Sequence, residues 1–193
     1  MNKIQWIQFF ITWNFNENVS VCRFLVHGWL NNGEHFLNID GTRAYLSNGE
    51  FNVIVVDWGM GAETSNYIRA RNRVGDVGRS LANIIDFMNQ SFNLRFEDIT
   101  VVGFSLGAHV AGIAGKTVRR GRINTIIGLD PAGPLFDINR VDTRLDSGDA
   151  QYVEIIHSNG RYSGFGLPMG HADFYPNGKI KQSSTITYNI NLK

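Results

Sequence analysis

The feature that most constrains the fold is a regular alternation of short apolar runs with longer amphipathic segments. Residues 64–89 carry apolar side chains at spacings of three and four, which predicts a helix, and residues 106–118 predict another. The short runs are apolar at consecutive positions, as strands buried on both faces are, and cover residues 23–26, 51–57, 99–104, 123–129 and 152–157. Strands that alternate with helices form a mostly parallel sheet with helices on both faces. The predicted fold class is therefore α/β.

The amino-acid composition excludes some classes of binding partner. The 193 residues carry 18 Lys and Arg against 17 Asp and Glu, a formal charge of +1, and so lack the basic surplus that nucleic-acid binding needs. No apolar run reaches the ~20 residues of a membrane-spanning helix. We therefore expect no nucleic-acid partner, no transmembrane segment, and one domain over residues 1–193.

Signals for cellular location point in different directions. Cys22 is the only cysteine, so no disulfide can form within the chain, which slightly favours the cytosol. Two sequons, at Asn18 and Asn89, would accept glycans in a secreted protein. Residues 4–13 faintly resemble a signal peptide, but Gln5 and Gln8 interrupt the apolar run and no small-residue cleavage site follows. A buried edge segment is the favoured interpretation of that stretch.

Residues directly after each predicted strand are the candidates for chemistry, because ligands of such sheets bind beyond the carboxyl ends of the strands. Residues 103–107 read Gly-Phe-Ser-Leu-Gly and lie between a predicted strand and a predicted helix. This is typical of a nucleophile elbow, in which larger side chains two residues to either side of the serine would collide. Ser105 is the candidate nucleophile. The alternative is a tight glycine turn without chemistry.

Three other residues complete this hypothesis. Asp130 directly follows the next predicted strand and is the candidate acid that would orient a histidine, although an isolated Asp-Pro pair would be interpreted as a turn. Leu106 follows the serine, and Trp29 follows His27 and Gly28 at an earlier strand end. The backbone N–H groups of Leu106 and Trp29 are predicted to form the oxyanion hole. Ordinary core packing is the alternative for the Trp29 side chain.

Several motifs, in this order along the chain, resemble the pancreatic-lipase family: VHGW at 26–29, VVDW at 55–58, GFSLGAH at 103–109, GLDPAGP at 128–134 and HADFYPNG at 171–178. The resemblance spans about residues 23–178. It implies an α/β-hydrolase fold, incomplete here at its N- and C-terminal strands, secretion, and hydrolysis of triacylglycerol or phospholipid esters without a required cofactor. It carries the nucleophile onto Ser105, the acid onto Asp130 and the oxyanion donors onto Trp29 and Leu106. The expected partner is a lipid substrate or a lipid–water interface.

A structural calcium ion is also implied by the resemblance. The family often holds one on an Arg-Leu-Asp-x-x-Asp segment, which residues 144–149 match. The implied ligands are the carboxylates of Asp146 and Asp149 and the carbonyls of Val141 and Arg144, all of them hard oxygen donors. A solvated acidic loop without a metal is the alternative.

Two other segments can each be interpreted either as part of a binding site or as having a structural role only. The glycine-rich residues 159–170 would lie beside the site, where Phe165, Leu167 and Met169 either contact acyl chains or anchor a surface loop. Basic residues gather at positions 116, 119, 120 and 122, after the second predicted helix. They either meet an anionic surface or, as we favour, complement the negative end of the helix dipole.

The chain departs from the family where the general base is expected. The family's histidine lies in a Cys-x-His-x-Arg segment beyond residue 178, whereas residues 179–193 form a divergent tail without that motif. His157 and His171 have the right chain order, but both positions are structural in the family. The chain is thus predicted to be a lipase-type serine esterase, with the activity of this truncated form open. The alternatives are a non-catalytic, yolk-protein-like lipid-binding module, an inert truncated product, or an incomplete gene model.

Overall fold

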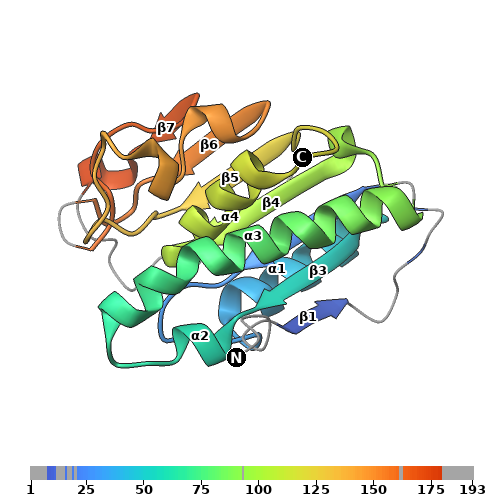
Figure 1. Cartoon of the computed structure of the whole chain (residues 1–193), viewed down its shortest axis with the longest axis horizontal. Helices are drawn as coiled ribbons and strands as arrows, with labels where there is room; N and C mark the ends of the chain where they lie inside the picture. Colours follow the sequence, from blue (N-terminus) through green and yellow to red (C-terminus); the bar gives the residue numbers. More distant parts are fainter. Residues whose placement is uncertain are drawn as a thin grey trace.

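A mostly parallel sheet forms the centre of the molecule (Figure 1). The computed structural model describes residues 8–11, 16, 19, 21–92, 94–160 and 163–179. Within them the strand order is β1-β3-β2-β4-β5-β6-β7, and only β1 (Gln8–Ile11) runs antiparallel to its neighbour, β3. The parallel strands are β2 (Cys22–Val26), β3 (Asn52–Asp57), β4 (Ile99–Phe104), β5 (Thr125–Leu129), β6 (Tyr152–Ile156) and β7 (Ala172–Phe174). The predicted α/β class is confirmed.

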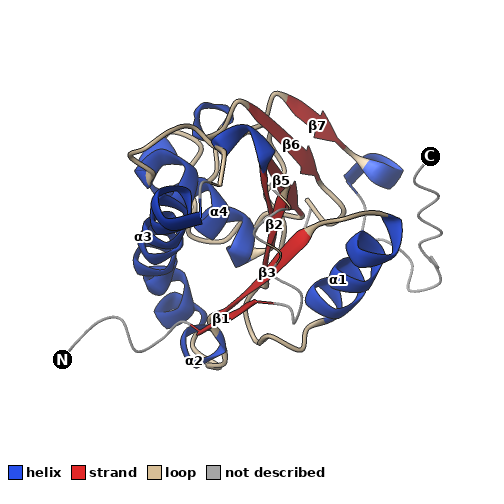
Figure 2. Cartoon of the chain, turned by 90° about the vertical axis from the view of Figure 1, so that its right-hand side faces the viewer, coloured by secondary structure: helices blue, strands red, loops and turns tan. Residues whose placement is uncertain are grey.

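Helices cover both faces of this sheet (Figure 2). On one face lie α3 (Tyr67–Phe92) and α4 (Leu106–Thr117), and on the other lies α1 (Phe36–Asn48). A single helical turn, α2 (Gly59–Ala62), follows β3. The described residues also include short 3₁₀ helices: η1 (Phe96–Asp98), η2 (Val141–Thr143), η3 (Ser147–Asp149) and η4 (Pro176–Lys179).

The sequence pattern does not predict α1 or β7, for physical reasons. In α1 the one fully buried residue is Asn38, while Phe36 and Ile39 are 60% and 46% exposed, so the apolar residues of this helix form no single stripe. The three residues of β7 are too few to show a strand period.

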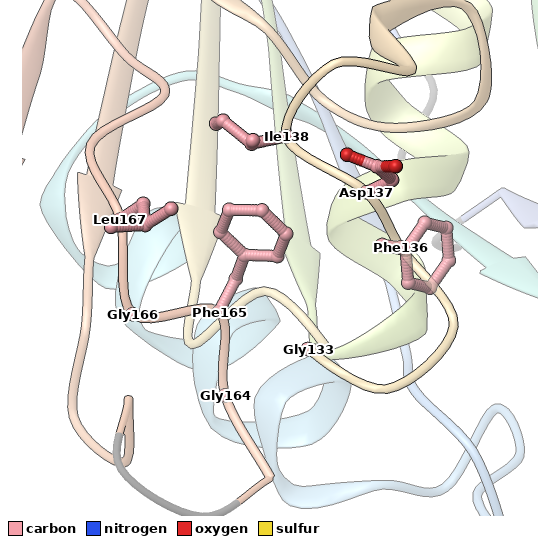
Figure 3. Close-up of a pocket in the computed structure, with 8 residues that line it drawn as sticks. All are labelled: Gly133, Phe136, Asp137, Ile138, Gly164, Phe165, Gly166 and Leu167. Atoms are coloured by element: carbon pink, nitrogen blue, oxygen red, sulfur yellow. The ribbon is translucent and has the colours of Figure 1, made fainter.

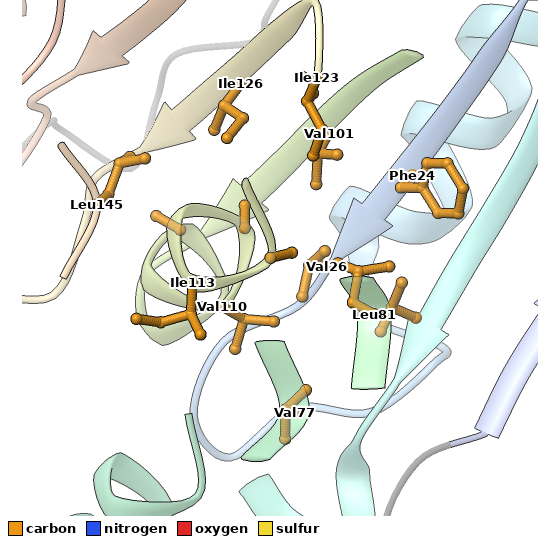
Figure 4. Packing of buried hydrophobic residues seen from close by; sticks show 14 of the residues in the cluster. Phe24, Val26, Val77, Leu81, Val101, Val110, Ile113, Ile123, Ile126 and Leu145 are labelled. Carbon is orange, nitrogen blue, oxygen red and sulfur yellow. The ribbon is translucent and has the colours of Figure 1, made fainter. Parts of the chain in front are cut away.

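The main core lies between the sheet and the two helices α3 and α4 (Figure 4). Val77 and Leu81 of α3 meet Val110 and Ile113 of α4 over the strands, and all four are almost fully buried. Close approach of the two helices depends on Gly78, where a Cβ would lie 2.5 Å from the Ile113 Cβ. A smaller cluster under α1 comprises Leu25, Val53 and Val102, with Leu37, Tyr45, Phe51, Ile127 and Leu129 packed around it.

Several sequence predictions concern the ends of the chain. The expected edge segment corresponds in part to β1, which pairs with β3 at the edge of the sheet. Its remaining residues, the sequon at Asn18 and residues 180–193 of the tail lie outside the described residues. The second sequon lies on α3, where the Asn89 side-chain oxygen accepts a hydrogen bond from Arg120 Nε at 2.8 Å. Among the described helices, none has the length and apolar character to cross a membrane.

The contact between α3 and α4 can be tested with two glycines of the same helix. Alanine at either Gly78 or Gly75 gains up to about 1 kcal/mol of helix propensity. At Gly75 the new Cβ would meet only the movable end of Arg79, at 3.2 Å, whereas at Gly78 it would meet Ile113. We expect Gly78→Ala to unfold with a free energy about 1–3 kcal/mol below that of Gly75→Ala in urea titrations. Equal stabilities would contradict the close packing of these helices.

Candidate active site

Ser105 lies on a sharp bend between β4 and α4. Its φ of 55° and ψ of −119° are in a region that costs a non-glycine residue about 1–3 kcal/mol. The Ser105 N–H donates to the carbonyl of Leu129 at 3.0 Å, and the Ser105 carbonyl accepts hydrogen bonds from Ala108 and Ala132 at 3.2 and 3.3 Å. These bonds fix the serine at the carboxyl ends of β4 and β5, outside any regular helix.

Glycines on both sides of the serine allow this bend. A Cβ at Gly103 would lie 2.3 Å from the carbonyl oxygen of Gly107, and a Cβ at Gly107 would lie 2.3 Å from the carbonyl oxygen of Val26. Both distances are far shorter than a real contact. The first turn of α4 therefore rests directly on the backbone of β2 and β4, as the predicted collision argument requires.

The turn after β2 lies against the serine. A Cβ at Gly28 would be 2.8 Å from the Ser105 Cβ, so the neighbouring Trp29 begins in direct proximity to the bend. The Trp29 indole N–H donates to the carbonyl of Thr64 at 2.7 Å, which fixes the side chain. Within the described part of the chain, the backbone N–H groups of Trp29 and Leu106 donate to no protein acceptor. Neither donor is thus committed to another described part of the protein.

Asp130 lies at the end of β5, next to β4, and its φ of 44° is also positive. Its N–H donates to the carbonyl of Ile156 at 2.7 Å, and its Oδ1 accepts from the N–H of Asn159 at 2.8 Å. Burial raises the pKa of Asp130, and hydrogen bonds from Asn159 and Ser158 oppose that rise. The carboxylate is thus held at the same edge of the sheet as Ser105.

Three of the five histidines are buried with both ring nitrogens engaged. His27 contacts the carbonyl of Gly28 and accepts from the N–H of Trp58, each at 3.0 Å. His157 lies 2.6 Å from the carbonyl of Phe165 and 2.7 Å from Asp173 Oδ1. His109, described below, is likewise enclosed. None of these rings offers a free nitrogen to Ser105.

The remaining two histidines lie at opposite ends of the parallel strands, His171 near the ends where the strands begin and His35 near their carboxyl ends. His171 accepts from the N–H of Val153 at 3.0 Å, near the start of β6. His35 begins α1 and stacks on the ring of Phe104 at 5.4 Å, one residue before the serine, while its Nδ1 accepts from Leu37 at 3.4 Å. No motif in the sequence connects His35 to the site. Its position a few residues after the Trp29 turn was the available signal.

Three of the four implied calcium ligands, Arg144, Asp146 and Asp149, are engaged by two cationic side chains. Lys116 Nζ donates to the Asp149 carboxylate and, at 3.0 Å, to the carbonyl of Arg144, whose own guanidinium donates to Asp146 at 3.0 Å. Burial raises the pKa of Asp149 to about 6, against the opposing charge of Lys116. No three His, Cys, Asp or Glu side chains of the described residues gather as a metal site. The residues as arranged do not fit a bound calcium ion.

Figure 3 shows a pocket of about 450 Å³. It lies close to Asp130, because a Cβ at Gly164, one of its lining residues, would be 2.5 Å from Asp130 Oδ1. Phe165 lies within it, and its N–H donates at 2.6 Å to the carbonyl of Pro131, the residue after Asp130. Phe165 is 6% exposed and serves as an anchor of its loop, whereas Leu167 is 51% exposed. The pocket lining comprises Gly133, Phe136, Asp137, Ile138, Gly164, Phe165, Gly166 and Leu167.

The sequence of this chain is similar to those of known lipases. The family model described as lipase matches residues 8–189. Lipase member H of Oryctolagus cuniculus is 41% identical over 160 residues, which cover 82% of this chain and 35% of that protein. Lipoprotein lipase of Homo sapiens is 37% identical over 177 residues, covering 84% and 37%. The chain thus spans about a third of the length of these curated relatives.

Solved structures resemble the fold. MGS-M1, an alpha/beta hydrolase enzyme from a deep-sea metagenome library, superimposes with a TM-score of 0.56 at 13% identity, over 92% of this chain and 77% of that one. A phospholipase/carboxylesterase from Dyadobacter fermentans gives 0.51 at 14% identity, over 77% and 70%. At such identities the likeness concerns the fold alone, which is that of an incomplete α/β hydrolase.

Backbone strain at the serine can be measured. Ser105→Gly and Ser105→Ala both remove the hydroxyl, but only glycine adopts a φ of 55° without steric cost. We expect Ser105→Gly to be more stable than Ser105→Ala by about 1 kcal/mol or more in urea unfolding, despite the greater freedom of glycine in the unfolded chain. An alanine variant as stable as the glycine variant would show that the bend is not strained.

The burial of His109 leads us to expect that the free energy of unfolding depends on pH. Because its Nδ1 accepts the N–H of Leu145 at 3.1 Å, its Nε2–H must donate to the carbonyl of Ala132, at 2.8 Å. Burial lowers the pKa of His109 to about 3, against about 6.5 for an unperturbed histidine. The unfolded chain therefore binds a proton that the folded chain does not, so this contribution to stability is complete above pH 6.5 and is lost as the pH falls.

The variant His109→Gln isolates this effect. Glutamine can make both hydrogen bonds but does not titrate. Unfolding free energies measured between pH 6.5 and 4 should fall less steeply in the variant, by up to about 1.4 kcal/mol per pH unit. Parallel slopes in the two proteins would contradict a buried neutral His109.

Proposed function

Because the chain belongs to the lipase family, the pancreatic-lipase family that its motifs resemble, we propose that it carries the nucleophile and oxyanion site of a serine carboxylic ester hydrolase. One observation supports this most strongly. The strained bend at Ser105, the two unpaired N–H groups of Trp29 and Leu106, and the Asp130 carboxylate share one edge of the sheet. The proposed substrates are lipid esters, either triacylglycerols or phospholipids. That substrate class and the extracellular location rest on family membership.

The proposed reaction begins with attack of Ser105 Oγ on the ester carbonyl carbon. As the new C–O bond forms, the carbonyl electron pair moves to oxygen, and the N–H groups of Trp29 and Leu106 stabilise the resulting oxyanion. Collapse of this intermediate expels the alcohol and leaves an acyl group on the serine, which water then removes. A base takes the serine proton and returns it to the leaving alcohol, and Asp130 stabilises the base while it is protonated.

Among the described residues, no histidine is hydrogen-bonded to Ser105 or Asp130, so none stands in the position of the base. His35 lies nearest along the chain to the site, where it stacks on Phe104, and its Nδ1 accepts from the N–H of Leu37. The buried histidines His27, His109 and His157 have both ring nitrogens engaged, and His171 lies near the ends where the parallel strands begin. A nucleophile with its oxyanion donors but no base retains only a remnant of activity. We propose that the 193-residue chain is in this state.

Free imidazole should supply part of the missing proton transfer. We expect hydrolysis of a short p-nitrophenyl ester by the purified chain to rise roughly 10-fold in imidazole buffer, less than a positioned base would give. Ser105→Ala in the same buffer measures hydrolysis by imidazole alone. Asp130→Asn should lose most of the enhancement, because the added imidazolium then lacks its carboxylate.

A second readout does not depend on turnover. An active-site fluorophosphonate should form an adduct that peptide mapping locates on Ser105. If the folded chain shows neither the adduct nor the enhancement, the serine mechanism is wrong. The non-catalytic lipid-binding alternative, which the engagement of the buried histidines favours, would then stand.

A further inference from the structure

Four charged side chains, two carboxylates and two cations, hold the connection between β5 and β6 against helix α4. Asp149 is 3% exposed and pairs with Lys116, while Arg144 is 2% exposed and pairs with Asp146. The four formal charges cancel within the cluster. A divalent cation placed among them would meet the positive charges of Arg144, which is buried, and of Lys116, whose side chain is 24% exposed. Both charges would repel it, and the repulsion from the buried Arg144 is only weakly screened.

Hydrogen-bond donors already occupy the oxygens that a cation would need. The carbonyl of Arg144 and Oδ1 of Asp149 both accept from the Lys116 ammonium, and Oδ2 of Asp149 accepts from the N–H of Asp146 at 2.8 Å. Asp146 Oδ1 accepts from Arg144, and its Oδ2 accepts from the N–H of Gly148 at 3.3 Å. Calcium requires six to eight oxygen ligands, so it could bind here only after the cationic groups of Lys116 and Arg144 had left these oxygens.

Packing of the helix backbone holds the lysine in this position. A Cβ at Gly112 would lie 2.8 Å from Asp149 Oδ2, and a Cβ at Gly115 would lie 2.2 Å from the Asp149 carbonyl oxygen. Helix α4 therefore lies directly on the loop, and Lys116, one turn after Gly112, extends along the same contact. Helix α4, which begins directly after Ser105, is thus fastened near its other end by an ion pair.

We propose that the ammonium group of Lys116 replaces the structural cation in this chain, so that the loop of residues 141–149 is closed on α4 without calcium. The replacement differs from a metal in one respect. The cation is covalently part of the helix that it fastens, so it cannot dissociate. This role is structural, and it holds whether or not Ser105 is a nucleophile.

Thermal unfolding of the whole 193-residue chain tests the proposal, with and without calcium. The midpoint of the unmodified chain should agree within about 1 °C between EDTA and millimolar CaCl₂. In EDTA, Lys116→Ala should lower the midpoint by roughly 5–15 °C, because it leaves a buried carboxylate unpaired. Calcium should then raise the midpoint of Lys116→Ala, since an ion that binds only the folded state stabilises it.

Arg119→Ala is the matched control. It removes an exposed cation three residues after Lys116, and it should neither lower the midpoint appreciably nor create a response to calcium. Three results would overturn the proposal: stabilisation of the unmodified chain by calcium, an unchanged midpoint in Lys116→Ala, or a destabilised Lys116→Ala that gains nothing from calcium. The comparison on the unmodified chain needs no variant, so it decides the question even if Lys116→Ala fails to fold.

Discussion

The direct contact between the first turn of α4 and the backbone of β2 and β4 is the constraint on which the site depends. Gly107 meets the carbonyl of Val26, and Gly103 meets the carbonyl of Gly107, at distances that admit no side chain. With a larger residue at either place the helix would stand away from the sheet, and Ser105 would lose its hydrogen bond to Leu129. The unfavourable backbone conformation of the serine persists because both of its neighbours are held in this way.

Elements with a strong period were predictable from the sequence. The strand β4 has its predicted bounds, and α4 ends one residue before its predicted end, because each packs on the core along its whole length. α1 was not predictable, since it buries Asn38 and exposes Phe36, and its position is set by contacts with the sheet that no local pattern records. The strand β7 extends an existing sheet edge, so three residues suffice to form it.

In the candidate site, too, the positions of the motif residues were predictable from the sequence, whereas contacts between residues far apart in the chain were not. The rule that functional residues directly follow the strands was enough to predict that Ser105 and Asp130 lie at the same end of the sheet. Parallel neighbours such as β4 and β5 have their carboxyl ends on the same side. The environments of the ionisable groups were not predictable. His109 is closed by Leu145, 36 residues later, and the partner of Lys116 lies 33 residues away, so dipole placement at a helix end was an incomplete interpretation of that lysine.

The register of the sheet restricts the number of residues in a strand more than the number of residues in a connection. Val26 pairs with Val56 and Gly103, and Phe104 pairs with Leu129, so the neighbouring strands end level with one another. Gain or loss of one residue inside a strand would move its end by about 3.3 Å and turn the next side chain to the opposite face. The loops that return the chain to the other edge carry no such condition. Related sequences can therefore change the length of exposed connections, but not of a connection such as residues 141–149 that packs on α4. The number of residues in each central strand has to stay the same.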